Sequence, residues 1–262
     1  MAKEESYATE AEMCAQFIAE IGEDWIAYPE TEGWDILLVR KADGFQIGVE
    51  AKLRLNGKVM TQALEEWYTF SGSERAGPDC RAVLVPEGKT GNLSRVAAYV
   101  GLTVVTIRKP APSGGWYTHG NRAQFTPALP TDRKYENPCA WHELCPAKRH
   151  ELPEYVPDVP AGDAAPVQLT KWKIAAIKIA VLLEKRGFVA RSDFKHLNID
   201  HRRWLPHEGG WLTLNDNGFV AGPRLPDFKR QHPRVYDEIA ADFDQWKPAD
   251  PLPRQKQHSL QI

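Results

Sequence analysis

The first hundred residues alternate between helical and strand-like patterns of apolar side chains. Residues 9–21 predict an amphipathic helix, because apolar residues recur at helical spacing and Gly22 follows as a stop. Two apolar runs, residues 34–40 and 45–53, flank the turn-like segment 41–44 and predict a β-hairpin. This part of the chain therefore mixes helices with paired strands.

The pattern after the hairpin predicts alternating helices and strands. The further elements expected here are a short strand at 25–28, helices at 59–70 and 93–100, and strands at 81–85 and 103–108. A hairpin followed by β-α-β crossovers implies the α/β class, with a mixed β-sheet flanked by helices.

Prolines divide the chain. Ten of the 20 prolines lie between Pro110 and Pro166, and this density excludes a long helix or a central strand. We therefore expect an α/β domain at 1–110, a connector at 111–165 in extended pieces, a second domain at 166–247 and a flexible tail at 248–262.

The charge distribution supports two units with different partners. The chain of 262 residues has a net charge of −2, yet residues 1–110 have 12 basic and 17 acidic residues, whereas residues 166–235 have 13 basic and 6 acidic residues. The basic part is a candidate for binding polyanions such as DNA. No apolar run is long enough to span a membrane, and the charged start lacks a secretory signal. With only four cysteines, we expect a cytoplasmic protein with reduced thiols.

The pattern of the basic part predicts helices followed by a hairpin. The expected elements are helices at 171–185, 192–196 and 200–204, a hairpin or wing at 211–221, and a final helix at 235–246. This order resembles a winged helix-turn-helix domain. The resemblance implies that His201, Arg202 and Arg203 meet DNA beside a recognition helix. The residues expected to contact phosphates are Lys171, Lys173, Lys195, Arg224, Lys229 and Arg230. The alternative is an unrelated helical domain with a basic, solvated face.

The predicted hairpin also places three charged side chains close together. If residues 41–44 connect the strands without a bulge, Asp35 lies opposite Glu50, and Lys52 points to the same face. Two facing carboxylates repel unless a cation compensates, and hard oxygen ligands select Mg²⁺ or Mn²⁺. The alternative is an exposed hairpin face where the three charges meet by chance.

At these residues the sequence resembles the PD-(D/E)xK nuclease superfamily. The signature of this superfamily, an acidic residue on one strand and Glu-x-Lys on the next, is matched by Asp35, Glu50 and Lys52. Trp34 stands where the signature has proline. The resemblance covers about residues 8–108 and implies a restriction-endonuclease-like α-β-β-β-α-β core and a metal-dependent DNA endonuclease.

The resemblance also implies supporting residues. Glu10 on the first helix suits the role of an additional carboxylate, with Glu12 as the alternative, and Gln62 matches a glutamine found on the following helix. Asp35, Glu50, the Ala51 carbonyl and Glu10 are the metal ligands implied. The metal would polarise the phosphodiester and lower the pKa of a bound water. Lys52 would orient that water or stabilise the developing charge.

A second candidate metal site lies in the connector. The residues Cys139, His142, Cys145 and His150 provide four ligands of the kind zinc prefers. Their spacing matches no common zinc module, and packed small thiols are the alternative.

Three functions remain open from the sequence. The first is a magnesium-dependent deoxyribonuclease with a C-terminal DNA-binding domain. The second is a non-catalytic DNA-binding or regulatory protein on a nuclease-like fold, and the third is a protein-interaction module. The intact Asp35, Glu50 and Lys52 set favours the first. The sequence does not determine whether the chain forms a homodimer, or whether the DNA substrate is a duplex, a junction, a flap or a single strand.

Overall fold

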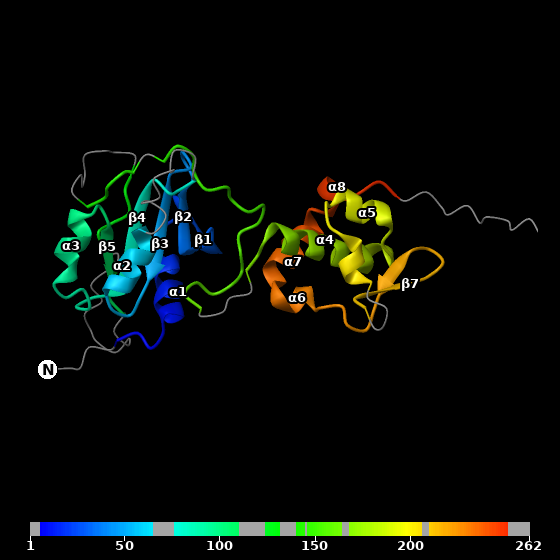
Figure 1. Ribbon diagram of the computed structural model, residues 1–262, viewed down its shortest axis with the longest axis horizontal. Helices are drawn as coiled ribbons and strands as arrows, with labels where there is room; N and C mark the ends of the chain where they lie inside the picture. The colour runs from blue at the N-terminus through cyan, green and yellow to red at the C-terminus, as the bar shows by residue number, and fades with distance from the viewer. Residues whose placement is uncertain are drawn as a thin grey trace, which may run out of the picture. The chain divides into compact units, whose positions relative to one another are not determined.

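The chain divides into two compact units, Met1–Pro166 and Val167–Ile262 (Figure 1). The computed structural model describes residues 6–64, 76–109, 124–131, 140–144, 146–163, 168–205 and 210–250. The described pieces of the predicted connector belong to the first unit, so this unit extends well beyond residue 110.

The first unit is built on one mixed β-sheet, whose strands lie in chain order. The strands are β1 (Trp25–Thr31), β2 (Trp34–Arg40), β3 (Gln46–Ala51), β4 (Cys80–Pro86), β5 (Thr103–Ile107) and β6 (Phe125–Thr126). Strands β1, β2 and β3 are antiparallel neighbours, β3, β4 and β5 are parallel, and β6 is antiparallel to β5. The predicted α/β class with a mixed sheet flanked by helices is confirmed.

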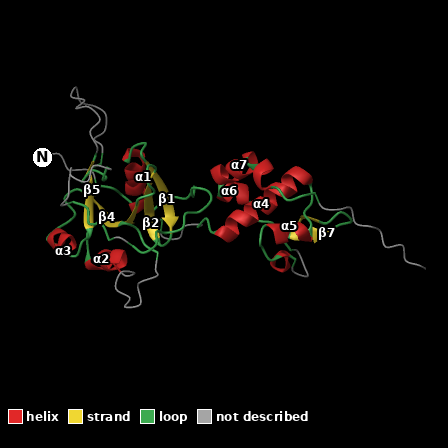
Figure 2. Ribbon diagram, turned by 90° about the horizontal axis from the view of Figure 1, so that it is seen from above, coloured by secondary structure: helices red, strands yellow, loops and turns green. Residues whose placement is uncertain are grey.

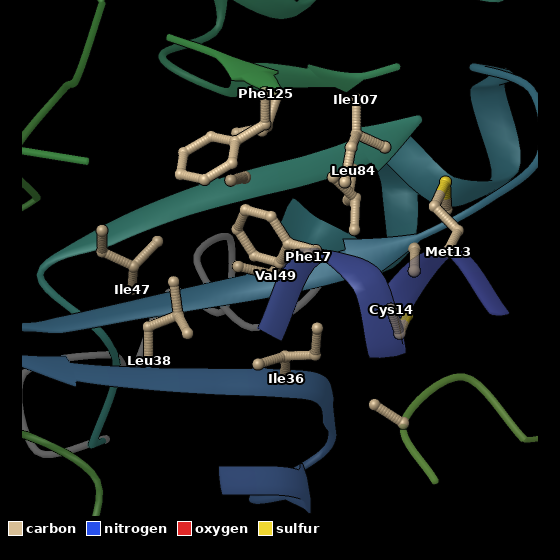
Figure 3. Packing of buried hydrophobic residues seen from close by; sticks show 14 of the residues in the cluster. Met13, Cys14, Phe17, Ile36, Leu38, Ile47, Val49, Leu84, Ile107 and Phe125 are labelled. Atoms are coloured by element: carbon tan, nitrogen blue, oxygen red, sulfur yellow. The ribbon is translucent and has the colours of Figure 1, made fainter. Parts of the chain in front are cut away.

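Helices cover both faces of this sheet. The helices are α1 (Glu10–Glu20), α2 (Gly57–Leu64) and α3 (Leu93–Tyr99). Figure 2 shows α1 on one side of the sheet and α2 and α3 on the other. On the α1 side, Met13 and Phe17 pack with Ile36, Val49 and other apolar side chains of the strands (Figure 3). This burial of apolar area stabilises the three-layered arrangement.

Some element boundaries differ from those expected. The strand predicted at 25–28 continues to Thr31 and pairs with β2 along its length. The strand predicted at 45–53 ends at Ala51, so Lys52 lies just beyond it. Helix α2 begins at Gly57, and residues 65–70 of the predicted helix lie outside the described residues.

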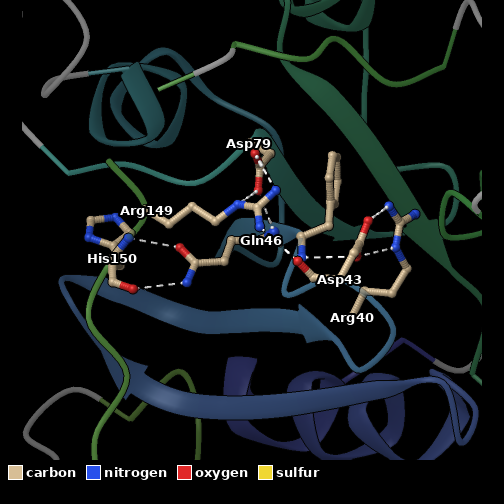
Figure 4. Close-up of polar contacts among 7 residues, drawn as sticks. Arg40, Asp43, Gln46, Asp79, Arg149 and His150 are labelled. Carbon is tan, nitrogen blue, oxygen red and sulfur yellow. Dashed lines mark hydrogen bonds and ion pairs between the residues drawn. The ribbon is translucent and has the colours of Figure 1, made fainter. Parts of the chain in front are cut away.

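Part of the connector is fixed to the sheet by polar contacts (Figure 4). The Arg149 guanidinium donates to both carboxylate oxygens of Asp79, at 2.7 and 3.1 Å, and to the Asp43 carbonyl at 2.8 Å. The side chain of Gln46 exchanges two hydrogen bonds with the backbone of His150. These charge-assisted and reciprocal bonds explain how a proline-rich segment becomes part of the first unit.

The second unit consists of short elements around one long helix. Its elements are α4 (Lys171–Arg186), α5 (Arg191–His196), η2 (His201–Trp204), β7 (Leu212–Leu214), β8 (Phe219–Ala221), α6 (Phe228–Gln231), α7 (Pro233–Ala241) and α8 (Phe243–Trp246). The predicted hairpin at 211–221 is present as β7 and β8, and Val189 forms an isolated bridge with Phe219. Fully buried Trp204 is surrounded by aromatic rings, including Phe194 and Trp211.

Two expectations for this unit need correction. The short helix expected at 200–204 is a 3-10 helix of four residues, His201–Trp204, with Asp200 as its N-cap and Trp204 fully buried. The helix expected at 235–246 is divided into α7 and α8 at Asp242. Among the described helices, none is both long and apolar enough to cross a membrane.

Candidate active site

The β2–β3 hairpin has the predicted register. Val39 pairs with Gln46 and Ile36 pairs with Val49, and continuing this register places Asp35 opposite Glu50. At Asp35 the side chain replaces the backbone as the partner of the next strand, since its carboxylate accepts a hydrogen bond from the Ala51 N–H at 2.7 Å. This bond anchors the Asp35 carboxylate at the end of β3.

Helix α1 brings a carboxylate to Lys52. The Lys52 ammonium lies 2.6 Å from the Glu10 carboxylate, and both side chains are partly exposed. Thr9 caps the helix by accepting a hydrogen bond from the Glu12 N–H. Glu12 itself bonds to the Ala8 N–H and to the ammonium of Lys109. Of the two candidate carboxylates, Glu10 is therefore the one that contacts the Lys52 side chain.

Burial and charge act on these groups together. Burial raises the pKa of Asp35 and the charge of Glu10 adds to this, while the Ala51 N–H and the charge of Lys52 oppose it. Burial lowers the pKa of Lys52, but its bond to Glu10 and the charges of Glu10, Asp35 and Glu50 outweigh burial and raise it overall. Lys52 is thus held as a cation among carboxylates, including the buried Glu50.

A fourth acidic residue belongs to this group and was missed by sequence reasoning. Pro29 pairs with Ile36 and Thr31 pairs with Trp34, so Glu30 lies opposite Asp35. The Glu30 carboxylate accepts a hydrogen bond from the Gly162 N–H at 2.8 Å. Burial raises the pKa of Glu30 to about 7, and the charge of Asp35 adds to the shift. The sequence signal that could have indicated this position is the dipeptide Glu32-Gly33, because it forms the turn that connects β1 to β2.

The raised pKa of Glu30 predicts a pH dependence of stability. The folded protein binds a proton at Glu30 that the unfolded chain has already released, so the free energy of unfolding should fall as the pH rises from about 5 to about 7. Glu30→Gln should flatten this dependence and gain stability relative to the wild type at pH 8. Urea unfolding at pH 5 and pH 8 checks this, with the exposed Glu23→Gln as the control. Parallel pH profiles for wild type and Glu30→Gln would contradict it.

The donor set at the end of β3 has the chemistry of a hard-cation site. Glu10, Asp35, Glu50 and the Ala51 carbonyl offer oxygen ligands, as Mg²⁺ and Mn²⁺ prefer. Within the described part of the chain, however, no three His, Cys, Asp or Glu side chains are placed to hold one metal ion. The contact with Lys52 uses only Oε2 of the Glu10 carboxylate, so Glu10 can bind a cation through Oε1 while it keeps this contact.

Two other positions that were compared with the nuclease superfamily, Gln62 and Trp34, are described by the structure. Gln62 is exposed on α2, a helix that packs on the sheet face opposite to α1. None of the described hydrogen bonds joins Gln62 to Asp35 or Lys52. Trp34, which replaces the proline, covers Gly48 so closely that an added β-carbon there would lie 2.3 Å from its ring. Trp34 is therefore a packing residue.

The candidate zinc ligands are only partly described. Cys139 and Cys145 lie outside the described residues, and His142 is exposed. His150 is buried, and its Nε2 accepts a hydrogen bond from the Trp34 indole N–H at 3.2 Å. Its Nδ1 lies 3.7 Å from Glu32. His150 thus contributes to packing between the connector and the sheet.

The basic residues of the second unit differ in their surroundings. Lys171, Lys195, Arg224, Lys229 and Arg230 are exposed. Lys173 bonds to Gln231 and lies over the Phe228 ring, and burial lowers its pKa.

The three residues expected on or beside a recognition helix, His201, Arg202 and Arg203, differ in their surroundings. The His201 ring packs beside Phe194 and Phe219, with centroid distances of 5.9 and 6.4 Å. Arg202 is exposed and forms two hydrogen bonds through its guanidinium to Asp200. The side chain of Arg203 lies outside the described part of the structure. Of these three, only Arg202 is described as presenting a charged group to solvent.

Comparison with known proteins gives no matching family model and no match among curated proteins.

Proposed function

We propose that the protein is a metal-dependent DNA endonuclease whose second unit binds DNA. The observation that carries this proposal is the convergence of α1, β2 and β3 at one end of the sheet. There the Lys52 ammonium contacts Glu10 at 2.6 Å, and the Asp35 carboxylate is fixed on the Ala51 N–H at 2.7 Å. A structural ion pair alone would not need two further acidic residues, Glu30 and Glu50, opposite Asp35 on the two neighbouring strands.

The order of elements supports a PD-(D/E)xK assignment. Helix α1, strands β1 to β3, helix α2 and strand β4 follow one another in the α-β-β-β-α-β order of that core. Asp35 lies at the start of β2, and Glu50 lies near the end of β3, followed by Lys52. These are the positions that the Asp…Glu-x-Lys signature requires.

The residue types suggest separate roles in phosphodiester hydrolysis. Asp35, Glu50, the Ala51 carbonyl and Glu10 would hold Mg²⁺ or Mn²⁺, which supplies charge neutralisation and a more acidic bound water. Lys52 is held as a cation at neutral pH by its acidic neighbours, so it would stabilise negative charge developing on the phosphate rather than act as a base. The Ala51 N–H would keep the Asp35 carboxylate oriented, and this hydrogen bond opposes the effect of burial on the pKa of Asp35.

The second unit is proposed as the DNA anchor. Its exposed basic residues Lys195, Arg224 and Arg230 provide the positive surface that phosphate binding requires. The β7–β8 hairpin and the bridge between Val189 and Phe219 support a winged-helix-like arrangement. The four-residue η2 helix is short for reading a major groove, so shape and phosphate contacts would account for most of the binding.

The direct test is cleavage of DNA by the full chain in the presence of Mg²⁺. We expect products with 5′-phosphate and 3′-hydroxyl ends, and we expect EDTA to stop the reaction. Tight DNA binding without cleavage in either Mg²⁺ or Mn²⁺ would instead support the alternative of a non-catalytic DNA-binding protein.

A further inference from the structure

A short segment of the connector covers the first turn of α1. We call residues 159–163 the strap; its Ala161 is buried in the same apolar cluster as Met13 and Cys14. Gly162 follows in a left-handed conformation, with φ +72°. A β-carbon added there would lie 3.2 Å from the Cys14 sulfur and 3.3 Å from the carbonyl carbon and Cβ of Glu10. The strap therefore lies directly against Glu10, and a side chain at residue 162 would require a shift of a few tenths of an ångström.

Glu30 holds this strap in place. Its carboxylate accepts the Gly162 N–H at 2.8 Å and a second backbone hydrogen bond from Asp163. The Glu30 backbone has φ +48°, a conformation that non-glycine residues seldom adopt. Such conformations persist where the surrounding structure imposes them, often next to functional groups. Here the unusual backbone conformation occurs at the residue whose carboxylate holds the strap beside Asp35.

These contacts form a continuous path to the proposed catalytic lysine. Glu30 bonds to Gly162, Gly162 packs on Glu10, and Glu10 bonds to Lys52. We propose that Glu30 and Gly162 are positioning residues, which fix the first turn of α1 through the strap and thereby keep the Glu10 carboxylate in contact with Lys52. The catalytic consequence rests on the proposed nuclease function, whereas the mechanical link does not.

Four single variants of the full chain separate this role from general stability. Glu30→Ala removes the acceptor, and Glu30→Gln retains an oxygen for the Gly162 N–H. Gly162→Ala keeps the acceptor but places a methyl group 3.3 Å from Glu10, so the strap and the first turn of α1 must move apart by a few tenths of an ångström. Gly22→Ala is the matched control, because Gly22 also has a left-handed conformation, φ +81°, but has no atom within 4 Å of an added β-carbon.

The first readout is hydrogen exchange, which does not depend on activity. Mass spectrometry of peptides covering residues 8–14 and 155–163 should show exchange about tenfold faster in Glu30→Ala and Gly162→Ala than in the wild type. The Glu12 and Met13 amides, which bond to Thr9, are the relevant ones in α1. Gly22→Ala should leave both peptides unchanged, and Glu30→Gln should remain close to the wild type. Faster exchange in the strap with unchanged exchange in residues 8–14 would overturn the proposal.

The second readout is the kinetics of Mg²⁺-dependent DNA cleavage. Glu30→Ala and Gly162→Ala should lower kcat by about tenfold or more with little change in KM, since small displacements of catalytic groups mainly affect the chemical step. Glu30→Gln should restore most of kcat, and Gly22→Ala should retain it. An unchanged kcat in both displaced variants would overturn the positioning role. If the wild type cleaves no DNA, the proposed function fails, and the exchange experiment still decides whether the strap fixes α1.

Discussion

Lys52→Ala is expected to lower Mg²⁺-dependent cleavage of DNA by about a thousandfold, because the variant loses the only cation described among Glu10, Asp35 and Glu50. Asp35→Asn and Glu50→Gln should have effects of similar size, since each removes a charged oxygen ligand. Single-turnover rates at saturating DNA measure the loss of the chemical step without interference from product release.

The stability of these variants should not follow their activity. Burial raises the pKa of Asp35, so the ionised carboxylate is unfavourable in the folded state at neutral pH, and Asp35→Asn should be at least as stable as the wild type. Lys41→Ala is the control for loss of a positive charge, because Lys41 is exposed in the turn between β2 and β3. A Lys52→Ala protein that cleaves DNA as fast as Lys41→Ala would refute the proposed role of Lys52.

Removing the second unit is expected to weaken DNA binding by about a hundredfold or more at low salt, because this unit has most of the exposed basic surface proposed for phosphate contacts. The first unit should remain folded, since the buried apolar residues on both faces of its sheet lie between Tyr7 and Ala161. Each lost phosphate contact should reduce the slope of log K against log salt by about 0.9. Fluorescence anisotropy with labelled DNA at several salt concentrations measures both quantities.

A charge-matched pair of full-length variants provides the control for this truncation. The triple variant Lys195→Ala, Arg224→Ala and Arg230→Ala removes three exposed positive charges from the second unit. The triple variant Lys41→Ala, Lys89→Ala and Arg95→Ala removes three from the first. We expect a reduced salt slope only in the former. Equal slopes in the two triple variants would show that the second unit is not the specific site of phosphate binding.

The hairpin of the candidate site was predictable because short-range rules determine it. The composition of residues 41–44 fixes the length of the turn, and the alternation of Ile47, Val49 and Ala51 fixes the face, so the pairing with β2 follows. The choice between Glu10 and Glu12 was not predictable, because both lie in the first turn of α1 and only tertiary contacts distinguish them.

Residues in the connector and on β1 escaped prediction for a related reason. Glu30 joins the site only through the β1–β2 hairpin and through Gly162, which is 132 residues away in the chain. Histidine is a residue type that zinc prefers, yet the Nε2 of His150 accepts a hydrogen bond from Trp34, which is 116 residues away. Long-range contacts of this kind leave no periodic signal in the sequence.

Binding of a divalent metal by Asp35 and Glu50 is the claim on which the proposed phosphodiester hydrolysis depends. The most direct measurement is a crystal structure of the full chain grown with Mn²⁺ and short DNA, with diffraction data collected at the manganese absorption edge. We predict an anomalous peak in contact with the carboxylates of Asp35 and Glu50, absent from crystals of Asp35→Asn grown under the same conditions. DNA bound in the crystal with no anomalous density at Asp35 and Glu50 would contradict the claim.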